Sequence, residues 1–261
     1  MKKIINKLFL AFAIAVCISS LGCKKESTSS TVATATGRLY FHLHTNVDTN
    51  EVENYGTVYK TSDGRKVSLT KAQLYISNIQ LIKEDGSLYS ISDTIVLKQL
   101  DPEQYFIANV PVGNYKAAKF HVGLDATTNA KPSSVNALLN IPDMWFGSSA
   151  QPDGYVFVNL EGNIDTTANA TGTEAQMQPF MYKIGTNAHY KEVTMPNHTP
   201  IYAVAKDQTT YMHIIIDYNK LFSGIQLGNS MNLMVHTAAD NTSAICNTMS
   251  NNIPSMFGYE E

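Results

Sequence analysis

Two histidines separated by one residue, His42-Leu43-His44, form the chemically most distinctive pattern in this sequence. They lie in the segment 38–47, where apolar and polar residues alternate as in a β-strand with one buried face. Residues two apart on a strand share a face and lie roughly 6.6 Å apart, at about 3.3 Å per residue. Two imidazoles at this spacing can bind one ion, and imidazole suits copper, zinc and nickel. The alternative is a pair of polar side chains on a solvated sheet face.

A third imidazole would complete a stable site, and the sequence offers five more histidines. His213 is the best candidate, because it lies in a second regular strand pattern at 211–218. We expect His121 and His236 to be hydrogen-bonded sheet residues, and His189 and His198 to be solvated in a proline-containing loop. Metal binding at the histidines should weaken as the pH falls through about 6.5, because the ligands must be deprotonated.

Common enzyme signatures are absent from the sequence, including G-x-S-x-G, H-E-x-x-H, a phosphate loop and a dinucleotide-binding fingerprint. No pair of carboxylates stands out as a general acid and base. We therefore expect a protein that is not an enzyme. Cys246 is interpreted as a buried, inert thiol, with a soft metal ligand as the alternative.

The N-terminus predicts export and lipid attachment. Three lysines precede an apolar run from Leu8 to Val16, and the segment closes on Leu21-Gly22-Cys23. This pattern predicts a lipoprotein signal peptide at 1–22, with Cys23 as the lipidated residue. A polar stretch at 23–36 would then tether the folded part to the membrane of the cell envelope, facing either the periplasm or the cell surface.

Removal of the signal peptide also takes away three lysines and no acid, so the formal charge of −3 becomes −6. A mildly acidic chain without a basic cluster has no electrostatic footprint for nucleic acid.

Short β-rich segments with frequent turn residues dominate the remaining sequence, and little of it has the pattern of a helix. The pattern predicts an all-β fold, an antiparallel β-sandwich forming a single domain over 37–261. Glu84-Asp85-Gly86 predicts a hairpin turn. The polar stretches 127–142 and 163–178 are expected to be long loops, and 251–257 a short apolar plug.

The only tryptophan, Trp145, stands between Met144 and Phe146 at the end of the first long loop. A lone tryptophan most simply covers the end of a sandwich. An oxidisable indole beside a metal-binding face would be a functional alternative.

An ordered series of motifs resembles the MbnP-like family over residues 38 to 235. The motifs are Gly64-Arg65-Lys66 with Leu74 to Leu81 and Asp85-Gly86, Val110 to Tyr115 with Phe120 to Asp125, Met144-Trp145 with Gly154 to Gly162, and Phe180 to Gly185. Two positions depart from the pattern: Trp145 stands alone where the family usually has two tryptophans, and Lys183 replaces a histidine.

This resemblance implies a β-sandwich that binds copper. It also implies a partner enzyme, a di-haem protein related to cytochrome c peroxidases, which would oxidise Trp145 to kynurenine. The modified residue would then contribute to the copper site alongside histidines. Family members are commonly lipoproteins, in agreement with Cys23.

We therefore expect a membrane-anchored copper-binding protein that uses His42 and His44, with His213 and the thioether of Met144 as candidates for completing the site. The alternative is a surface interaction module that keeps the sandwich fold without metal, and whose long polar loops form the contact surface.

Overall fold

The computed structural model describes residues 34–147, 154–167 and 176–260, which belong to one compact unit beginning at Thr34. The predicted signal peptide 1–22, Cys23 and most of the tether 23–36 lie outside the described residues. No helix among the residues described is long and apolar enough to cross a membrane.

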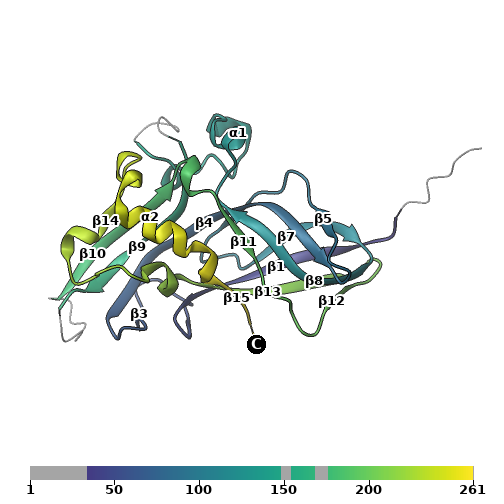
Figure 1. Ribbon diagram of the computed structural model, residues 1–261, viewed down its shortest axis with the longest axis horizontal. Helices are drawn as coiled ribbons and strands as arrows, with labels where there is room; N and C mark the ends of the chain where they lie inside the picture. The colour runs from purple at the N-terminus through teal and green to yellow at the C-terminus, as the bar shows by residue number, and fades with distance from the viewer. Residues whose placement is uncertain (1–33, 148–153, 168–175, 261) are drawn as a thin grey trace, which may run out of the picture. The chain divides into compact units, whose positions relative to one another are not determined.

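Two β-sheets make up most of the described chain (Figure 1). The first contains β1 (Thr36–Val47), β2 (Asn50–Glu51), β7 (Gln104–Pro111), β13 (Thr209–Asp217) and β15 (Phe257–Tyr259). The second contains β3 (Val58–Lys60), β4 (Lys66–Lys83), β5 (Leu88–Ser90), β6 (Val96–Lys98), β8 (Gly113–Val122), β9 (Val156–Asp165), β10 (Met177–Gly185), β11 (Lys191–Thr194), β12 (Tyr202–Val204) and β14 (Met234–Val235). The expected all-β, sandwich-like fold is confirmed.

Most strand pairs are antiparallel as expected, but both sheets also contain a parallel pair. β1 pairs with β13 in parallel, with His42 opposite His213, and β10 pairs with β14 in parallel. Parallel neighbours need a long crossover connection, and here most of the second sheet lies between β1 and β13 in the sequence. Figure 1 shows the two strands side by side.

The main core lies between the two sheets. Phe41 and Leu43 of β1 and Leu74 and Ile76 of β4 are fully buried in it. Side chains alternate along a strand, so the residues between these apolar ones face away from the core. His42 and His44 therefore lie on the outer face of the first sheet.

A second apolar cluster covers the opposite face of β4. Tyr75, which lies between Leu74 and Ile76, packs there with Tyr155 and Phe157. The main core thus separates the outer face of the first sheet from this second cluster.

Helical structure is more frequent than the sequence indicated. The expected loop 127–142 contains part of α1 (Ala126–Asn129) and the 3₁₀ turn η1 (Ser133–Val135), and a second 3₁₀ turn, η2 (Pro142–Met144), begins at its last residue. Further 3₁₀ segments are η3 (Asn187–His189), η4 (Tyr218–Phe222), η5 (Ser230–Asn232) and η6 (Ala239–Thr242). In the expected loop 163–178, β9 continues to Asp165 and β10 begins at Met177, while 168–175 lie outside the described residues.

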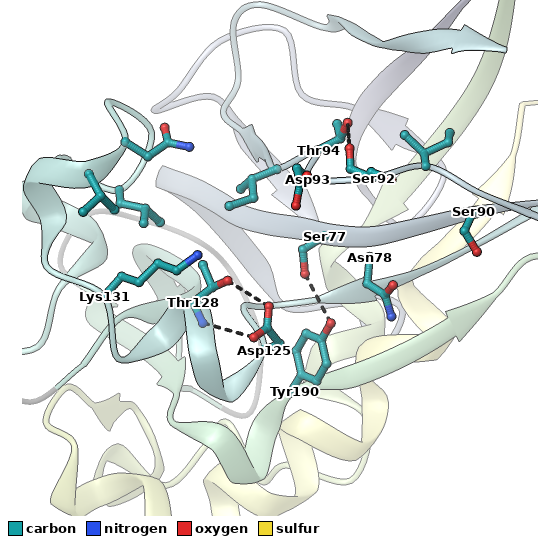
Figure 2. Close-up of a pocket in the computed structure, with 15 residues that line it drawn as sticks. Ser77, Asn78, Ser90, Ser92, Asp93, Thr94, Asp125, Thr128, Lys131 and Tyr190 are labelled. Carbon is teal, nitrogen blue, oxygen red and sulfur yellow. Dashed lines mark hydrogen bonds between the residues drawn. The ribbon is translucent and has the colours of Figure 1, made fainter. Parts of the chain in front are cut away.

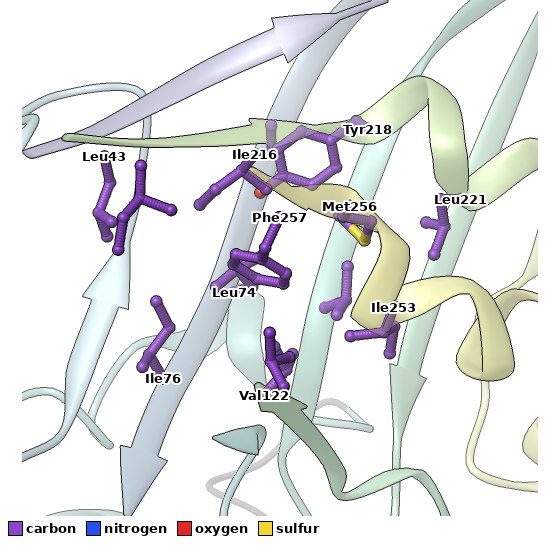
Figure 3. Close-up of a cluster of buried hydrophobic side chains, with 14 of the residues drawn as sticks. Leu43, Leu74, Ile76, Val122, Ile216, Tyr218, Leu221, Ile253, Met256 and Phe257 are labelled. Atoms are coloured by element: carbon purple, nitrogen blue, oxygen red, sulfur yellow. The ribbon is translucent and has the colours of Figure 1, made fainter. Parts of the chain in front are cut away.

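The C-terminal segment consists of α2 (Ala244–Asn252), η7 (Ile253–Met256) and β15. Ser243 caps α2 by accepting a hydrogen bond from the backbone N–H of Cys246. The predicted apolar plug is confirmed, because Ile253, Met256 and Phe257 are buried in the main core. Figure 3 shows these three side chains among the core residues contributed by the sheets.

Gly162 of β9 is a position where any side chain would collide with the neighbouring strand. An added Cβ would overlap the backbone carbonyl oxygen of Ser68 on β4. We expect Gly162→Ala to lower the free energy of unfolding by about 1–3 kcal/mol, the usual cost of overpacking. Gly258→Ala is the matched control, since a Cβ added at that position would meet no atom within 4 Å. Equal urea midpoints for the two variants would contradict the prediction.

Candidate metal centre

Three histidines converge on the outer face of the first sheet. His42 and His44 project from β1 and His213 projects from β13, and one ring nitrogen from each lies within 4.8 Å of the others. The Nδ1 atoms of His42 and His213 are 3.1 Å apart. The His42 and His44 ring centroids lie 4.3 Å apart, which confirms that these side chains share a face. Parallel pairing in register explains the arrangement, because it places His42 directly beside His213.

Three glutamates surround the histidines, and no motif in the sequence marks them. Glu103 Oε2 lies 3.2 Å from Nε2 of His42, and Glu51 Oε1 lies 2.6 Å from Nδ1 of His44. Glu260 Oε2 lies 3.1 Å from Nδ1 of His213 and 3.4 Å from Nε2 of His44. Each glutamate lies in or directly beside a strand without a recognisable pattern around it, so no local signal in the sequence could have found it.

Backbone contacts hold two of these glutamates in place. The carbonyl oxygen of Glu103 accepts a hydrogen bond of 2.9 Å from the N–H of Leu43, the residue between the two histidines. Glu51 belongs to β2 and pairs with Asn46 of β1. The carboxylates of Glu51 and Glu103 are therefore positioned by the same strand that carries the imidazoles.

One ring nitrogen of His44 is buried and makes no hydrogen bond, which favours a cation in this cluster. His44 is 8% exposed, and its Nε2 atom makes no hydrogen bond although its Nδ1 atom contacts Glu51. A buried polar atom without a hydrogen bond is costly. A cation bound between the three imidazoles would satisfy it, and the nearby carboxylates would offset the positive charge. The donor set of three imidazoles fits copper as well as zinc.

A buried lysine contributes to the electrostatics of this region. Lys98 is fully buried, and its Nζ donates a 3.3 Å hydrogen bond to the carbonyl oxygen of Leu100. Burial lowers the pKa of Lys98 to about 8, against the opposing influence of Glu103, Asp101 and Glu51. Two of the carboxylates that face the histidines, Glu103 and Glu51, thus also stabilise the charged form of this lysine.

The structure does not bring Met144 to the histidines. Met144 ends η2, is fully buried and packs in the second cluster with Tyr75 and Tyr155. Because that cluster and the histidines lie on opposite sides of the main core, the thioether is not placed to complete the histidine group. The sequence could not show this, since Met144 and His42 are related only through the pairing of distant strands.

Trp145 lies beside Met144, against the second cluster. Its Nε1–H donates a 2.9 Å hydrogen bond to the carbonyl oxygen of Leu139, and its backbone forms an isolated bridge with Tyr155. The indole is half-buried, which agrees with a cover over an apolar cluster. It is not among the side chains that surround the histidines.

Comparison with known proteins assigns the chain to a protein family. The family model for MbnP matches residues 36–243, most of the chain. This protein belongs to the MbnP family. The solved structure of MbnP from Methylosinus trichosporium is similar at 15% identity and a TM-score of 0.48, covering 72% of this chain and 78% of that one. No curated protein sequence matches the chain.

The part of the chain matched by the MbnP family model includes His42, His44 and His213, together with Glu51 and Glu103. It ends at residue 243, before the C-terminal segment of α2, η7 and β15. The third glutamate of the cluster, Glu260, therefore belongs to a segment outside the family match.

The other histidines of this MbnP-family chain lie apart from the cluster. His121 stacks on Tyr190 with ring centroids 4.2 Å apart, and His236 is exposed beside Asp240. The expectation that His189 is solvated is wrong, because it is only 2% exposed. His198 is half-buried and stacks on Tyr202.

His189 packs against the thiol of Cys246. The Cys246 Sγ atom lies 3.6 Å from Nε2 of His189 and 3.4 Å from Oδ1 of Asn241. Burial raises the pKa of the Cys246 thiol to about 12, so the sulfur stays protonated at neutral pH. The residue is fully buried, which agrees with its interpretation as an inert core thiol.

Burial of His189 predicts a loss of stability in acid. Burial lowers the pKa of His189 below the ordinary 6.5, and its Nδ1 atom has no partner that could accept a hydrogen bond from a second N–H. The unfolded chain therefore binds a proton at a higher pH than the folded chain does. The contribution to stability is complete above about pH 6.5 and is lost as the pH falls below that value.

The free energy of unfolding of wild type should accordingly decrease between pH 7 and pH 5 in urea titrations. His189→Gln cannot titrate and keeps an amide donor near the Asn241 carbonyl oxygen, which His189 Nε2 approaches to 2.8 Å. Its stability should be lower at pH 7 but should fall less steeply with acidification. Identical slopes in the two proteins would show that His189 is not responsible.

A polar pocket of about 1020 Å³ lies elsewhere on the second sheet and its loops. Figure 2 shows Tyr190 directed toward Ser77, with their hydroxyl oxygens 3.4 Å apart, and Asp125 capping α1 through Thr128. Residues between 128 and 139 of the expected loop form part of the lining. None of the three clustered histidines lines this pocket.

Proposed function

We propose that this protein is a copper-binding protein of the cell envelope, with His42, His44 and His213 as its ligands, and that it carries copper and is not an enzyme. The observation that carries the proposal is the convergence of three imidazoles, one ring nitrogen of each within 4.8 Å of the others, together with the buried Nε2 atom of His44 that makes no hydrogen bond. Membership of the MbnP family supports copper over other metals that imidazole accepts.

The surrounding carboxylates support this assignment. Glu103 contacts Nε2 of His42, and Glu51 contacts Nδ1 of His44, so these two carboxylates do not occupy the second nitrogen of either ring. Carboxylates in this outer position fix the ring orientation and tautomer and make the imidazole a better donor. A pair of unrelated polar residues on a solvated face would not need such partners.

A copper titration of the chain from residue 23 onward tests the proposal, with Cys23→Ser to prevent lipid attachment. Binding of Cu(I) is measured against a chromophoric chelator, and binding of Cu(II) by isothermal titration calorimetry. One copper ion per chain is the expected result for at least one oxidation state. Absence of binding for both ions would contradict the proposal.

We further propose that Cys23 anchors the protein in the outer membrane, facing the periplasm or the cell surface. Intact mass of the protein from its native host tests this, because the anchored form carries acyl chains on Cys23 and lacks residues 1–22. An unlipidated chain recovered from the soluble fraction would contradict the anchor.

A di-haem cytochrome c peroxidase-like enzyme is the proposed protein partner, acting on Trp145. The indole is half-buried, so an edge of it can be reached from outside. Peptide mapping of protein from the native host would show kynurenine at position 145. An unmodified Trp145 in copper-loaded native protein would contradict this partnership, and it would leave the histidine site unaffected.

The second candidate function is a surface binding module without metal. The observation that favours it is the large polar pocket lined in part by the loop around α1. In that case, Lys131→Ala and Asp125→Ala in the pocket would reduce partner binding, while the double substitution of His42 and His44 would not.

A further inference from the structure

We propose that the large polar pocket on the second sheet binds a neutral saccharide. This inference goes beyond the proposed copper function, because it needs no metal and none of the three clustered histidines lines the pocket. It also names a ligand class for a pocket whose ligand the second candidate function left open. The pocket has a volume of about 1020 Å³, comparable with the larger small-molecule sites of proteins.

Four separate segments contribute to the wall of this pocket. They are the middle of β4 with Ser77 and Asn78, the stretch 90–95 that leads from β5 to β6, the stretch 125–139 that includes α1, and Tyr190. Figure 2 shows Asn78, Asp93 and Lys131 arranged around the same space. Serine, threonine, asparagine and tyrosine make up most of the lining. Their hydroxyl and amide groups both donate and accept hydrogen bonds, as the hydroxyl groups of a sugar require.

The charges of the lining favour a neutral ligand. Among the described residues, the lining contains one cation, Lys131, and two acids, Asp93 and Asp125. Asp125 uses both carboxylate oxygens at α1, where they accept from the backbone N–H groups of Thr127 and Thr128 and from the hydroxyl of Thr128. The charges of Asp93 and Lys131 then cancel. A phosphorylated or strongly acidic ligand calls for several cations, so an uncharged polyol fits this lining better.

Tyr190 provides a rigid aromatic surface at the pocket. Its ring stacks on that of His121 with centroids 4.2 Å apart and planes 12° apart, and its hydroxyl oxygen lies 3.4 Å from that of Ser77. Tyr190 lines the pocket whereas His121 does not, so His121 supports the ring from the side away from the pocket. The face of an aromatic ring carries negative charge, and it therefore attracts the C–H bonds on one face of a sugar ring.

Two non-glycine residues of the wall have a left-handed backbone conformation. Asn78 has a φ of 50° at the place where the pairing of β4 with β8 is irregular, and Asp93 has a φ of 55°. Each such conformation costs about 1 kcal/mol or more, and these conformations cluster at ligand sites. An irregularity within a strand also redirects a side chain. The strain thus occurs at two positions that place an amide and a carboxylate at the pocket.

Isothermal titration calorimetry with neutral oligosaccharides tests the inference. The probes are soluble oligomers of glucose, xylose, mannose and N-acetylglucosamine. The protein is the chain from residue 23 onward with Cys23→Ser, kept free of metal by EDTA. At least one probe should bind with one-to-one stoichiometry. Absence of binding for all of them would overturn the inference.

Asn78→Gly and Asp93→Gly test the position of the site. Both substitutions remove a polar side chain and preserve the backbone, because glycine adopts a positive φ without steric cost. Each should weaken binding of the saccharide at least about 10-fold through the loss of its hydrogen bonds. Asp207→Gly is the matched control, since Asp207 has a φ of 59° and does not line the pocket. Its affinity for the saccharide should equal that of wild type.

The outcomes separate this inference from the copper proposal. The double variant His42→Ala with His44→Ala should bind the saccharide as wild type does, whether or not wild type binds copper. Unchanged affinity in both Asn78→Gly and Asp93→Gly would place the saccharide elsewhere and overturn the assignment. Tighter binding of polygalacturonate, an acidic polysaccharide, than of any neutral probe would overturn the choice of a neutral ligand.

Discussion

The double substitution His42→Ala with His44→Ala should abolish copper binding. It removes two of the three imidazoles that converge on one point, and His213 alone cannot form a stable site with the remaining carboxylates. The variant should stay folded, because both side chains lie on the outer face of the first sheet and the alternate residues Phe41 and Leu43 keep the core intact. Chelator competition measures the affinity and circular dichroism checks the fold.

His236→Ala is the matched control for this experiment. His236 is exposed and pairs with Asp240, outside the histidine cluster. Its removal should leave copper affinity unchanged. Unchanged affinity in the His42 and His44 double variant, in a folded protein, would show that copper binds elsewhere.

Phe257→Ala should lower the free energy of unfolding by about 3–5 kcal/mol, the usual cost of removing a buried phenylalanine side chain. Phe257 is 9% exposed, packs in the main core and stacks edge-on against Phe120 with ring centroids 5.1 Å apart. Urea unfolding measures this effect.

Met231→Ala provides the comparison for an apolar truncation without burial. Met231 is 84% exposed, so its removal should change stability by less than about 0.5 kcal/mol. A Phe257→Ala variant as stable as Met231→Ala would mean that the C-terminal segment does not pack as described.

Local patterns in the sequence identified the strands that carry the histidines. Alternation over 38–47 predicted that His42 and His44 share a face, and β1 confirms it with Leu39, Phe41 and Leu43 buried on the other side. The same argument selected the strand of His213. The hairpin at Glu84-Asp85-Gly86 also formed, joining β4 and β5.

Those local patterns do not predict which distant strands pair with each other. Nothing local to β1 or β13 specifies that they are parallel or that His42 lies opposite His213. Glu51, Glu103 and Glu260 come from three separate segments and meet the histidines only through strand pairing. Met144 was expected near the histidines because nothing in the sequence shows which side of the main core it occupies.

The separation of Trp145 from the histidines has a consequence for the proposed partner. Trp145 packs with the second cluster on one side of the main core, and the histidines lie on the other side. Oxidation of Trp145 would not place a new ligand beside them in this fold. Copper affinity of the histidine site should therefore be the same whether or not Trp145 is modified.

X-ray absorption spectroscopy on the copper-loaded chain tests the central claim most directly, because it identifies the atoms bound to the metal. We predict nitrogen and oxygen neighbours with the multiple-scattering pattern of about three imidazoles, and loss of that pattern in the His42 and His44 double variant. A spectrum dominated by sulfur scattering, or one with no imidazole contribution, would contradict the assignment of copper to His42, His44 and His213.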